Sequence, residues 1–414
     1  MQVIVRSIAF AVAASLLLSH AVAQEWTRFR GPNGTGVSDT KTIPTKWTAD
    51  DYNWSVDLPG IGNSSPVVWG EKLFVLSADP KSATRYVICI NTKDGSTQWT
   101  KEYASEPHHL HPRNTFGSGT PAVDAERVYV SWSTPKETTL KALDHAGNEQ
   151  WSLDLGRWVS QHGYGNSPIV YEDTVILFNS QQADQLKSGE KPGESAMIAL
   201  DRETGKVRWQ SPRVSGLANY VMPCILETVA VPQLLATSTG EGVFSLNPKT
   251  GEKNWGIDAF SMRTVSSPIV AGGLIFGSTG SGGGGNYLVA VKPGAQPEIV
   301  YEFKRNAPYV PTPVAHGDLV FLFGDKGVGT CINAKTGEAH WTERLGSGFS
   351  GSPVIAGDAV YGIDEDGVVV VVAASKEFQL LGKMPLGEPS RATPAISGGH
   401  MYLRTYSKLF SIGG

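Results

Sequence analysis

The sequence predicts an all-β fold, an eight-bladed β-propeller whose blades are four-stranded antiparallel sheets. Three observations support this prediction. The composition favours strands and turns, a unit of four strands recurs along the chain, and the two ends of the chain supply complementary parts of one unit. The propeller is expected to form a single domain over residues 52–414, after an extended lead-in over residues 24–51.

The composition is typical of a folded β protein. Of 414 residues, 47 are Gly and 25 are Pro, whereas only 18% are charged. Hydrophobic residues make up 40%, which is enough for a folded core. The formal net charge of −4 argues against nucleic acid as a partner, because nucleic-acid binding requires a basic surface.

The first 23 residues are expected to be a signal peptide. Arg6 precedes an apolar run over residues 8–18, which is too short to span a membrane, and Ala21-Val22-Ala23 fits a cleavage site. The alternative interpretation of this apolar segment is a first strand buried in the fold. No cysteine lies near the cleavage point and no later segment is typical of a transmembrane anchor, so the chain is expected to be exported to the periplasm or outside the cell.

The repeat begins each time with a small residue, a proline and an apolar strand. Successive prolines lie 40 to 55 residues apart, which is the period expected of propeller blades. A polar turn and a second apolar run follow, as expected for a hairpin. The prolines of the eight copies are Pro66, Pro121, Pro168, Pro223, Pro268, Pro313, Pro353 and Pro394.

A third strand in each copy leads into a turn with a fixed pattern. In the clearest copy, Asp201 begins the turn, Gly205 follows it, and Trp209 lies four residues further on. An Asp or Asn can cap the turn, and a Gly can adopt the left-handed conformation that closes it. A tryptophan in this phase is expected to pack between neighbouring blades. The predicted docking residues are Trp54, Trp99, Trp151, Trp209, Trp255 and Trp341.

The two ends of the chain are expected to share one blade. The last copy stops after its third strand, over residues 409–414, and a strand with the missing tryptophan lies at Tyr52–Leu58. The N-terminal strand would therefore complete the eighth blade and close the ring, which removes its open edges. A solenoid, the alternative repeat fold, would instead need capping repeats at both ends.

The unit A-x-D-x-x-T-G-x-x-x-W, complete from Ala199 to Trp209, resembles the tryptophan-docking motif of PQQ-like propellers. This superfamily includes quinoprotein alcohol dehydrogenases and BamB, the propeller lipoprotein of the outer-membrane β-barrel assembly machinery. The segments Trp26–Gly34 and Ile43–Trp47 resemble the start of exported bacterial PQQ-like repeat proteins. The resemblance implies the propeller fold over residues 52–414 but does not by itself assign a function.

In such propellers, the loops before the first strands and the loops between strands two and three surround one mouth of the channel. Arginines and tyrosines around a funnel suit an anionic or sugar-like ligand, or the edge of a peptide. The alternative is that these side chains only fill the channel and bond to the strand ends. The candidate ligand-binding residues are Arg113, His162, Tyr164, Asn219, Tyr220, Arg263, Tyr309 and Arg391.

Other motifs carry less chemical information. His108, His109, His111 and His162 could bind a metal, but they lack the spacing of known zinc sites, so solvated loops are expected. The acidic turns at residues 325–327 and 364–367 lack the EF-hand pattern and are expected to be ordinary turns. The three cysteines, Cys89, Cys224 and Cys331, are far apart and are expected to be buried and unpaired.

Two functions remain open from the sequence. The first is an exported scaffold that binds a partner protein of the cell envelope, or a small ligand, through the face with the loops, without catalysis. The second, implied by the resemblance, is a quinoprotein alcohol dehydrogenase that uses PQQ with calcium. Those enzymes carry two adjacent cysteines, which are absent here, and no catalytic residue or calcium ligand can be matched to this sequence.

Overall fold

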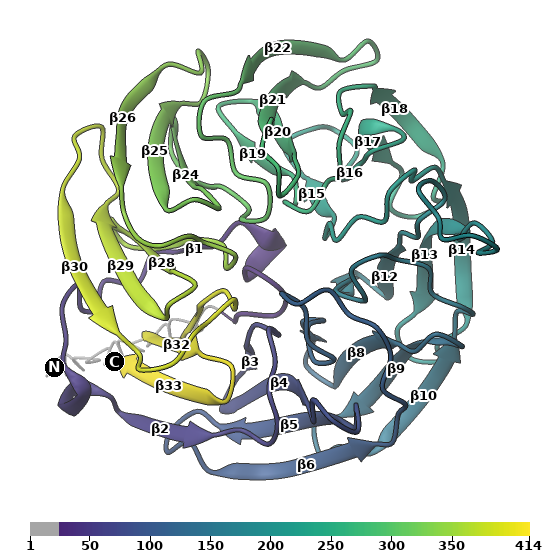
Figure 1. Ribbon diagram of the computed structural model, residues 1–414, viewed down its shortest axis with the longest axis horizontal. Helices are drawn as coiled ribbons and strands as arrows, with labels where there is room; N and C mark the ends of the chain where they lie inside the picture. Colours follow the sequence, from purple (N-terminus) through teal and green to yellow (C-terminus); the bar gives the residue numbers. More distant parts are fainter. Residues whose placement is uncertain (1–24) are drawn as a thin grey trace, which may run out of the picture.

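The computed structural model describes residues 25–414, so the signal peptide predicted for residues 1–23 lies outside the described part. Eight separate β-sheets stand around a common axis and form a ring (Figure 1). The prediction of an all-β, eight-bladed propeller is therefore confirmed. The helices of the described residues are two 3₁₀ turns, η1 (Pro32–Gly34) and η2 (Ala49–Asp51), and no helix there is long and apolar enough to cross a membrane.

Within each blade, consecutive strands pair in antiparallel fashion, from a short inner strand to a longer outer strand. The alternation of apolar strands with Gly-containing turns produces this meander. Blade 1 contains β3 (Val67–Trp69), β4 (Lys72–Ala78), β5 (Arg85–Asn91) and β6 (Thr97–Tyr103); blade 2 contains β7 (Ala122–Val123), β8 (Arg127–Ser133), β9 (Thr138–Asp144) and β10 (Glu149–Asp154); blade 3 contains β11 (Ile169–Tyr171), β12 (Thr174–Asn179), β13 (Ser195–Asp201) and β14 (Val207–Arg213); blade 4 contains β15 (Cys224–Leu226), β16 (Gln233–Ser238), β17 (Gly242–Leu246) and β18 (Lys253–Ile257).

The second half of the ring repeats this arrangement. Blade 5 contains β19 (Ile269–Ala271), β20 (Leu274–Thr279), β21 (Tyr287–Lys292) and β22 (Glu298–Phe303); blade 6 contains β23 (Val314–His316), β24 (Leu319–Phe323), β25 (Val328–Asn333) and β26 (Ala339–Arg344); blade 7 contains β27 (Val354–Ala356), β28 (Ala359–Ile363), β29 (Val368–Ala373) and β30 (Leu380–Pro385), with β1 (Val37–Ser38) beside β27; blade 8 contains β31 (Ala395–Ser397), β32 (His400–Arg404), β33 (Lys408–Gly413) and β2 (Trp54–Asp57).

Both ends of the chain contribute to blade 8, which closes the ring. Strand β2 lies outside β33 and pairs with it in antiparallel register, with Trp54 opposite Ser411 (Figure 1). Tyr52 also contacts Phe410, with 5.0 Å between the ring centroids. The predicted closure is therefore confirmed, and it leaves no unpaired edge at either end of the repeat.

The tryptophans of the repeat lie between blades. The indole N–H of Trp209 in blade 3 donates to the Pro248 carbonyl in blade 4 at 3.1 Å, and Gly251 of the same turn lies against the indole ring. Trp54, Trp99, Trp151 and Trp341 donate to the next blade in the same way. Trp255 instead donates to Gln233 of its own blade, although its ring packs in a cluster shared with blade 5.

In seven of the eight blades, a Ser or Thr before the repeat proline joins the inner ends of adjacent blades. Its hydroxyl accepts a hydrogen bond from the backbone N–H of the equivalent residue in the preceding blade, as Ser267 does from Met222 at 3.1 Å. Equivalent bonds, all near 3 Å, lead around the ring and return from Thr393 to Ser65. Blade 4 interrupts the series because its equivalent residue, Met222, has no hydroxyl group. The recurring Ser/Thr-Pro pair is thus the sequence signature of a hydrogen-bonded inner ring.

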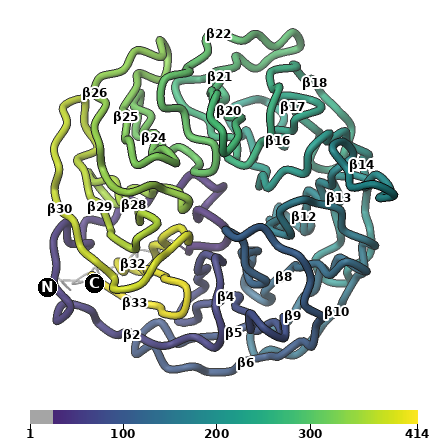
Figure 2. The backbone as a smooth tube through the Cα atoms, in the orientation of Figure 1, coloured from purple at the N-terminus to yellow at the C-terminus, as the bar shows by residue number. Residues whose placement is uncertain are grey.

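The lead-in of residues 25–51 crosses the centre of the ring (Figure 2). Arg28 donates to the Pro223 carbonyl of blade 4 and Arg30 to the Pro313 carbonyl of blade 6, both at 2.6 Å. The side chain of Asn33 bonds both backbone groups of Ile225, so the lead-in contacts blade 4 where the hydroxyl series is interrupted. Trp26, Arg28 and Arg30 are buried. The lead-in therefore fills the central channel.

The apolar core is divided into layers between blades. Seven clusters of buried side chains each join adjacent blades, and the largest joins blades 7, 8 and 1 to the lead-in. This is the physical reason for the repeat, because a single blade could not bury both of its faces.

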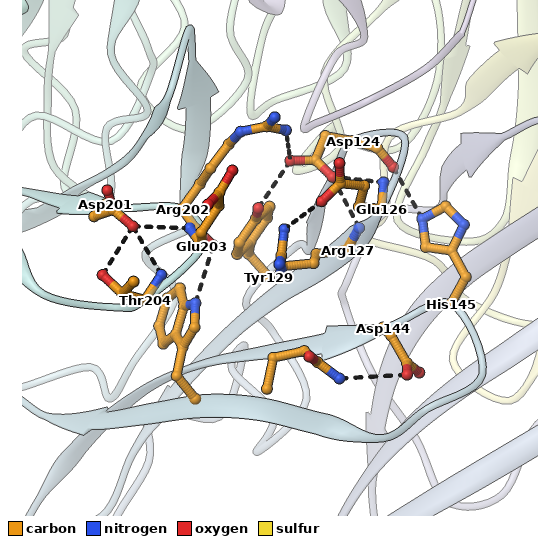
Figure 3. Close-up of polar contacts among 12 residues, drawn as sticks. Asp124, Glu126, Arg127, Tyr129, Asp144, His145, Asp201, Arg202, Glu203 and Thr204 are labelled. Carbon is orange, nitrogen blue, oxygen red and sulfur yellow. Dashed lines mark hydrogen bonds and ion pairs between the residues drawn. The ribbon is translucent and has the colours of Figure 1, made fainter.

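A polar contact joins blades 2 and 3 beside one of these layers (Figure 3). Arg202, from a turn of blade 3, donates to the buried carboxylate of Asp124 in blade 2 at 2.9 Å, and the Tyr129 hydroxyl donates to the same carboxylate at 2.8 Å. Burial raises the pKa of Asp124, but hydrogen bonds from Glu126, Tyr129, Arg127 and Arg202 outweigh it and hold this pKa below its usual value. Both carboxylate oxygens of Asp124 accept hydrogen bonds from within the fold, which indicates a structural role.

Candidate functional site

The loops before the first strands and those between strands two and three lie at one end of the ring, which we call the loop face. Six of the eight candidate residues take part in connected clusters there: Arg113, His162, Tyr220, Arg263, Tyr309 and Arg391. They come from the loops before blades 2, 3, 4, 5, 6 and 8. The closed ring thus brings together side chains that are far apart in the sequence.

Arg263 is the central residue of this group. It is buried, its Nη1 donates to Nδ1 of His162 at 2.7 Å, and its Nη2 donates to Oε1 of Gln161 at 3.1 Å. Because an arginine can only donate, Nδ1 of His162 carries no proton and the neutral ring is protonated at Nε2. Burial, together with the charge of Arg263, lowers the pKa of His162 to about 4. Both of these hydrogen-bond partners of Arg263, His162 and Gln161, are therefore neutral, and neither balances its positive charge.

A second cluster surrounds the carboxylate of Glu365, in the turn between β28 and β29. Arg113 lies 3.3 Å and Arg391 3.5 Å from its oxygens, and the Ser350 hydroxyl donates to it at 2.6 Å. The side chain of Arg113 is 52% exposed, whereas that of Arg391 is 20% exposed and lies over the ring of Tyr406. One carboxylate thus faces two guanidinium groups, and the cluster retains a positive charge.

Two tyrosines extend the site. The Tyr220 hydroxyl contacts the Ser160 hydroxyl at 2.7 Å and donates to the Gly163 carbonyl at 3.1 Å. Burial raises the pKa of Tyr220 and of Tyr309, the latter to about 12, so both phenols keep their protons at neutral pH. Beside Tyr309, the backbone N–H groups of Tyr309 and Val310 donate to Asp325. Burial raises the pKa of Asp325.

The other two candidates have contacts inside the fold. Tyr164 is buried and packs edge-on against Trp158, with 4.8 Å between the ring centroids. Asn219 is buried as well, and its side-chain amide donates to the Thr237 carbonyl and accepts from the Val221 N–H. Neither contact joins the two clusters around Arg263 and Glu365.

The histidine-rich loop contributes one more ring to the site. The ring of His111 packs against that of His162 at a tilt of 36°, with 4.7 Å between their centroids, and its Nδ1 accepts the backbone N–H of Arg113. Both Nδ1 lone pairs are therefore occupied. Within residues 25–414, no group of three or more His, Cys, Asp or Glu side chains is placed to hold a metal ion.

A calcium-assisted quinone does not fit these donors. On the loop face, Glu365 is bonded to two arginines and Ser350, and Asp325 is bonded to backbone N–H groups. The three cysteines are free and buried, in β5, β15 and β25 of different blades. Neither of these two carboxylates is therefore free for calcium, and the described residues hold no adjacent cysteine pair to lie beside a quinone.

Sequence reasoning missed Glu365, Gln161 and Asp325. Glu365 and Asp325 were expected only as parts of ordinary turns, although both turns join strands two and three and so open onto the loop face. Their position in the repeat was the signal that could have identified them. Gln161 is adjacent to His162 in the chain, but no pattern marked it.

The low pKa of His162 predicts an acid-sensitive fold. Its pKa lies near 4 in the folded chain and near 6.5 in its ordinary state, so the unfolded chain binds more protons between these values. We therefore expect the free energy of unfolding to decrease as the pH falls from about 6.5 to about 4. Urea unfolding at several pH values measures this slope. The variant His162→Gln should show a shallower slope, and an unchanged slope would contradict the assignment.

Comparison with known proteins agrees with this architecture. The model of a protein family described as "Outer membrane protein assembly factor BamB" matches residues 83–322 and 302–412. None of the curated proteins matches the sequence significantly.

Solved structures with the same fold include both enzymes and an assembly factor. A quinohemoprotein alcohol dehydrogenase, ADHIIG from Pseudomonas putida HK5, superposes with a TM-score of 0.68 at 13% identity, covering 94% of this chain and 80% of that one. The quinohemoprotein alcohol dehydrogenase from Comamonas testosteroni gives 0.67 at 14% identity, with the same coverage. BamB from Moraxella catarrhalis gives 0.60 at 16% identity, covering 86% of this chain and 95% of that one. At these identities the likeness extends to the fold alone.

Proposed function

Since the chain belongs to the family of the outer membrane protein assembly factor BamB, we propose that it is an exported scaffold that binds an anionic group on its loop face. The anion is a carboxylate of a partner protein in the cell envelope or of a small ligand. The signal sequence expected over residues 1–23 supports export to the periplasm or outside the cell.

One observation carries the proposal: three arginines of the loop face, Arg113, Arg263 and Arg391, lie near enough to His111 for their charges to add to burial in lowering its pKa, and a single ion-paired carboxylate, Glu365, faces two of them. Arg263 adds a charge whose side-chain hydrogen bonds go to the neutral groups of His162 and Gln161. A buried cation without a neutralising partner is costly, so a carboxylate that reaches it gains charge-assisted hydrogen bonds. Tyr220 and Tyr309 add two phenolic hydroxyls beside it.

The site has few of the groups that catalysis requires. The Nδ1 atoms of His111 and His162 both accept hydrogen bonds, and the two carboxylates are held by arginines or backbone N–H groups. A general base needs a free lone pair that reaches the substrate. The arrangement therefore favours binding over chemistry.

Calorimetric titration with two probes tests the proposal. Citrate represents a small carboxylate ligand and hexaglutamate represents an acidic protein segment; we expect saturable binding of at least one, weakened by added salt. A third titration uses PQQ with Ca²⁺ and follows tryptophan fluorescence and dye-linked alcohol oxidation. Turnover in that arm would replace the scaffold with a dehydrogenase, and the absence of binding by both carboxylates would refute the anion site.

A further inference from the structure

A cavity of about 540 Å³ lies between blades 2 and 3, and none of its lining residues belongs to the proposed anion site. One wall is the end of β10 with the residues that follow it, Leu155 and Arg157. The opposite wall is formed by β13 and β14, with Ala196, Ile198 and Val207. Residues of the long loop between β12 and β13, including Gln181 and Lys191, complete the lining.

The equivalent space between blades 1 and 2 is filled by an aromatic pair. Tyr103 lies four residues after the docking residue Trp99, and its ring centroid is 5.0 Å from that of Trp132 on β8. Leu155 lies four residues after the next docking residue, Trp151, and so takes the place of Tyr103. Blade 3 therefore faces a leucine where blade 2 faces a tyrosine.

The strand register identifies the second replacement. In blade 2, Trp132 pairs with Thr139, three residues before Ala142, which lies opposite the docking tryptophan. In blade 3, Asn179 pairs with Ala196, three residues before Ala199, which also lies opposite the docking tryptophan. Asn179 thus stands where the preceding blade has a tryptophan.

Three smaller or less polar residues replace their counterparts on the same wall. The register matches Ala196 with Thr139, Ile198 with Lys141, and Val207 with Glu149. In blade 2, Lys141 and Glu149 form an ion pair, and Lys141 also lies 5.0 Å above the ring of Tyr103. In blade 3 this arrangement is absent, and Val207 is left 49% exposed. All five replacements line the cavity, and none of them supplies the aromatic ring or the ion pair found at the equivalent place between blades 1 and 2.

Asn179 is a polar residue of the cavity lining. Its side chain is buried, with 3% of the residue exposed, and its Oδ1 has no hydrogen-bond partner. A buried acceptor without a donor is costly, and a ligand that brings an N–H or O–H group would relieve that cost.

The surrounding walls are already held in place. Oε1 of Gln181 accepts the backbone N–H of Val159 at 3.0 Å, and its Nε2 donates to the Glu194 carbonyl at 3.2 Å. Arg157 donates to the Lys191 carbonyl at 2.8 Å, which ties the loop to the opposite wall. A ligand would therefore enter a largely preformed site.

We propose that this cavity binds an aromatic side chain of a partner protein, a tryptophan or tyrosine, whose N–H or O–H donates to Asn179. The ring would fill the space that Tyr103 and Trp132 fill at the preceding interface. Tryptophan and tyrosine are the residues that most often anchor protein interfaces, because they combine a large apolar ring with one polar atom. The proposal does not depend on Arg263 and is independent of the anion site.

Ligand-observed NMR with the full chain tests the proposal. The probes are indole and p-cresol, which carry a donor, toluene, which does not, and the tripeptides Gly-Trp-Gly and Gly-Leu-Gly. We expect indole and p-cresol to bind about five- to tenfold more tightly than toluene, the usual effect of one hydrogen bond to a buried acceptor. Gly-Trp-Gly should bind at least as tightly as indole, and more tightly than Gly-Leu-Gly.

Two variants separate the apolar from the polar contribution. Asn179→Leu should abolish the preference for indole over toluene. The double variant Leu155→Tyr with Asn179→Trp recreates the aromatic pair of blades 1 and 2; it should weaken indole binding by at least tenfold and raise the melting temperature, because filled cavities stabilise a fold. If the double variant does not fold, Ala196→Leu reduces the cavity by a smaller change. The matched control, Val300→Tyr on the exposed face of β22, should leave binding unchanged.

Three results would overturn the proposal. They are equal binding of toluene and indole to the unmodified chain, undiminished indole binding to the filled variants, and binding of indole without binding of Gly-Trp-Gly. The last result would identify a small aromatic compound, rather than a protein side chain, as the ligand.

Discussion

Replacing Trp209 with alanine is expected to lower the free energy of unfolding by about 3–5 kcal/mol, which is the usual cost of truncating a buried aromatic side chain. Trp209 is 8% exposed and packs in the layer between blades 3 and 4, where its indole N–H reaches the Pro248 carbonyl. The truncation leaves a cavity and an unpaired carbonyl at one blade interface. Urea unfolding monitored by circular dichroism measures the loss.

The variant Trp209→Phe separates packing from hydrogen bonding. It retains most of the ring but leaves the Pro248 carbonyl without its donor, so a loss of about 1–3 kcal/mol is expected. Equal losses in the alanine and phenylalanine variants would show that the hydrogen bond, and not the ring, holds the two blades together.

Replacing Arg263 with glutamine is expected to weaken binding of the carboxylate probe about 10- to 100-fold, the range for hydrogen bonds to charged groups. The variant removes the guanidinium charge, whose hydrogen-bond partners His162 and Gln161 are both neutral. Titration calorimetry at low and at high salt measures the effect. The difference between the two proteins should shrink as salt screens the site.

Arg208→Gln is the matched control, because it changes the net charge equally. Arg208 is 48% exposed and pairs with Asp173 and Asp201, beside the turn between β13 and β14 and away from the loop face. If this control weakens probe binding as much as Arg263→Gln does, overall charge rather than a site explains the affinity. Because Arg263 is buried, Arg391→Gln offers a second test if the first variant unfolds.

The two proposed sites arise from different departures from the repeat. At the loop face, the loops vary in sequence while the strands that carry them stay regular, so charged side chains can meet without disturbing the blades. Between blades 2 and 3 the departure lies in the strands, where Leu155 and Asn179 replace an aromatic pair. Because the repeat is regular, residues that depart from it can be identified by comparing equivalent positions in neighbouring blades.

The solved structures with this fold include both BamB and quinohemoprotein alcohol dehydrogenases. Here Glu365 and Asp325 are already bonded, and the lead-in fills the centre of the ring with Arg28 and Arg30. These features support a binding role.

The amino-acid sequence alone determined the fold, because the information for it is local and repeated. The Ser/Thr-Pro pairs, the Asp-to-Trp turns and the tryptophan strand at residues 52–58 together specified four-stranded blades, their number and the closure of the ring. It also singled out Arg113, His162 and Arg263 as residues of loops at one mouth of the channel. Each of these predictions required only the position of a residue within its own repeat unit.

The tertiary structure alone decided which of these side chains meet. Arg263 and His162 are 101 residues apart in the chain, and Glu365 is farther still from Arg113, so no local pattern could pair them. The same holds for the lead-in, whose arginines bond to carbonyls in blades 4 and 6, and for the cavity, which depends on residues from two blades. Such contacts form only when the ring closes, because their energies depend on distances in space rather than on separation along the chain.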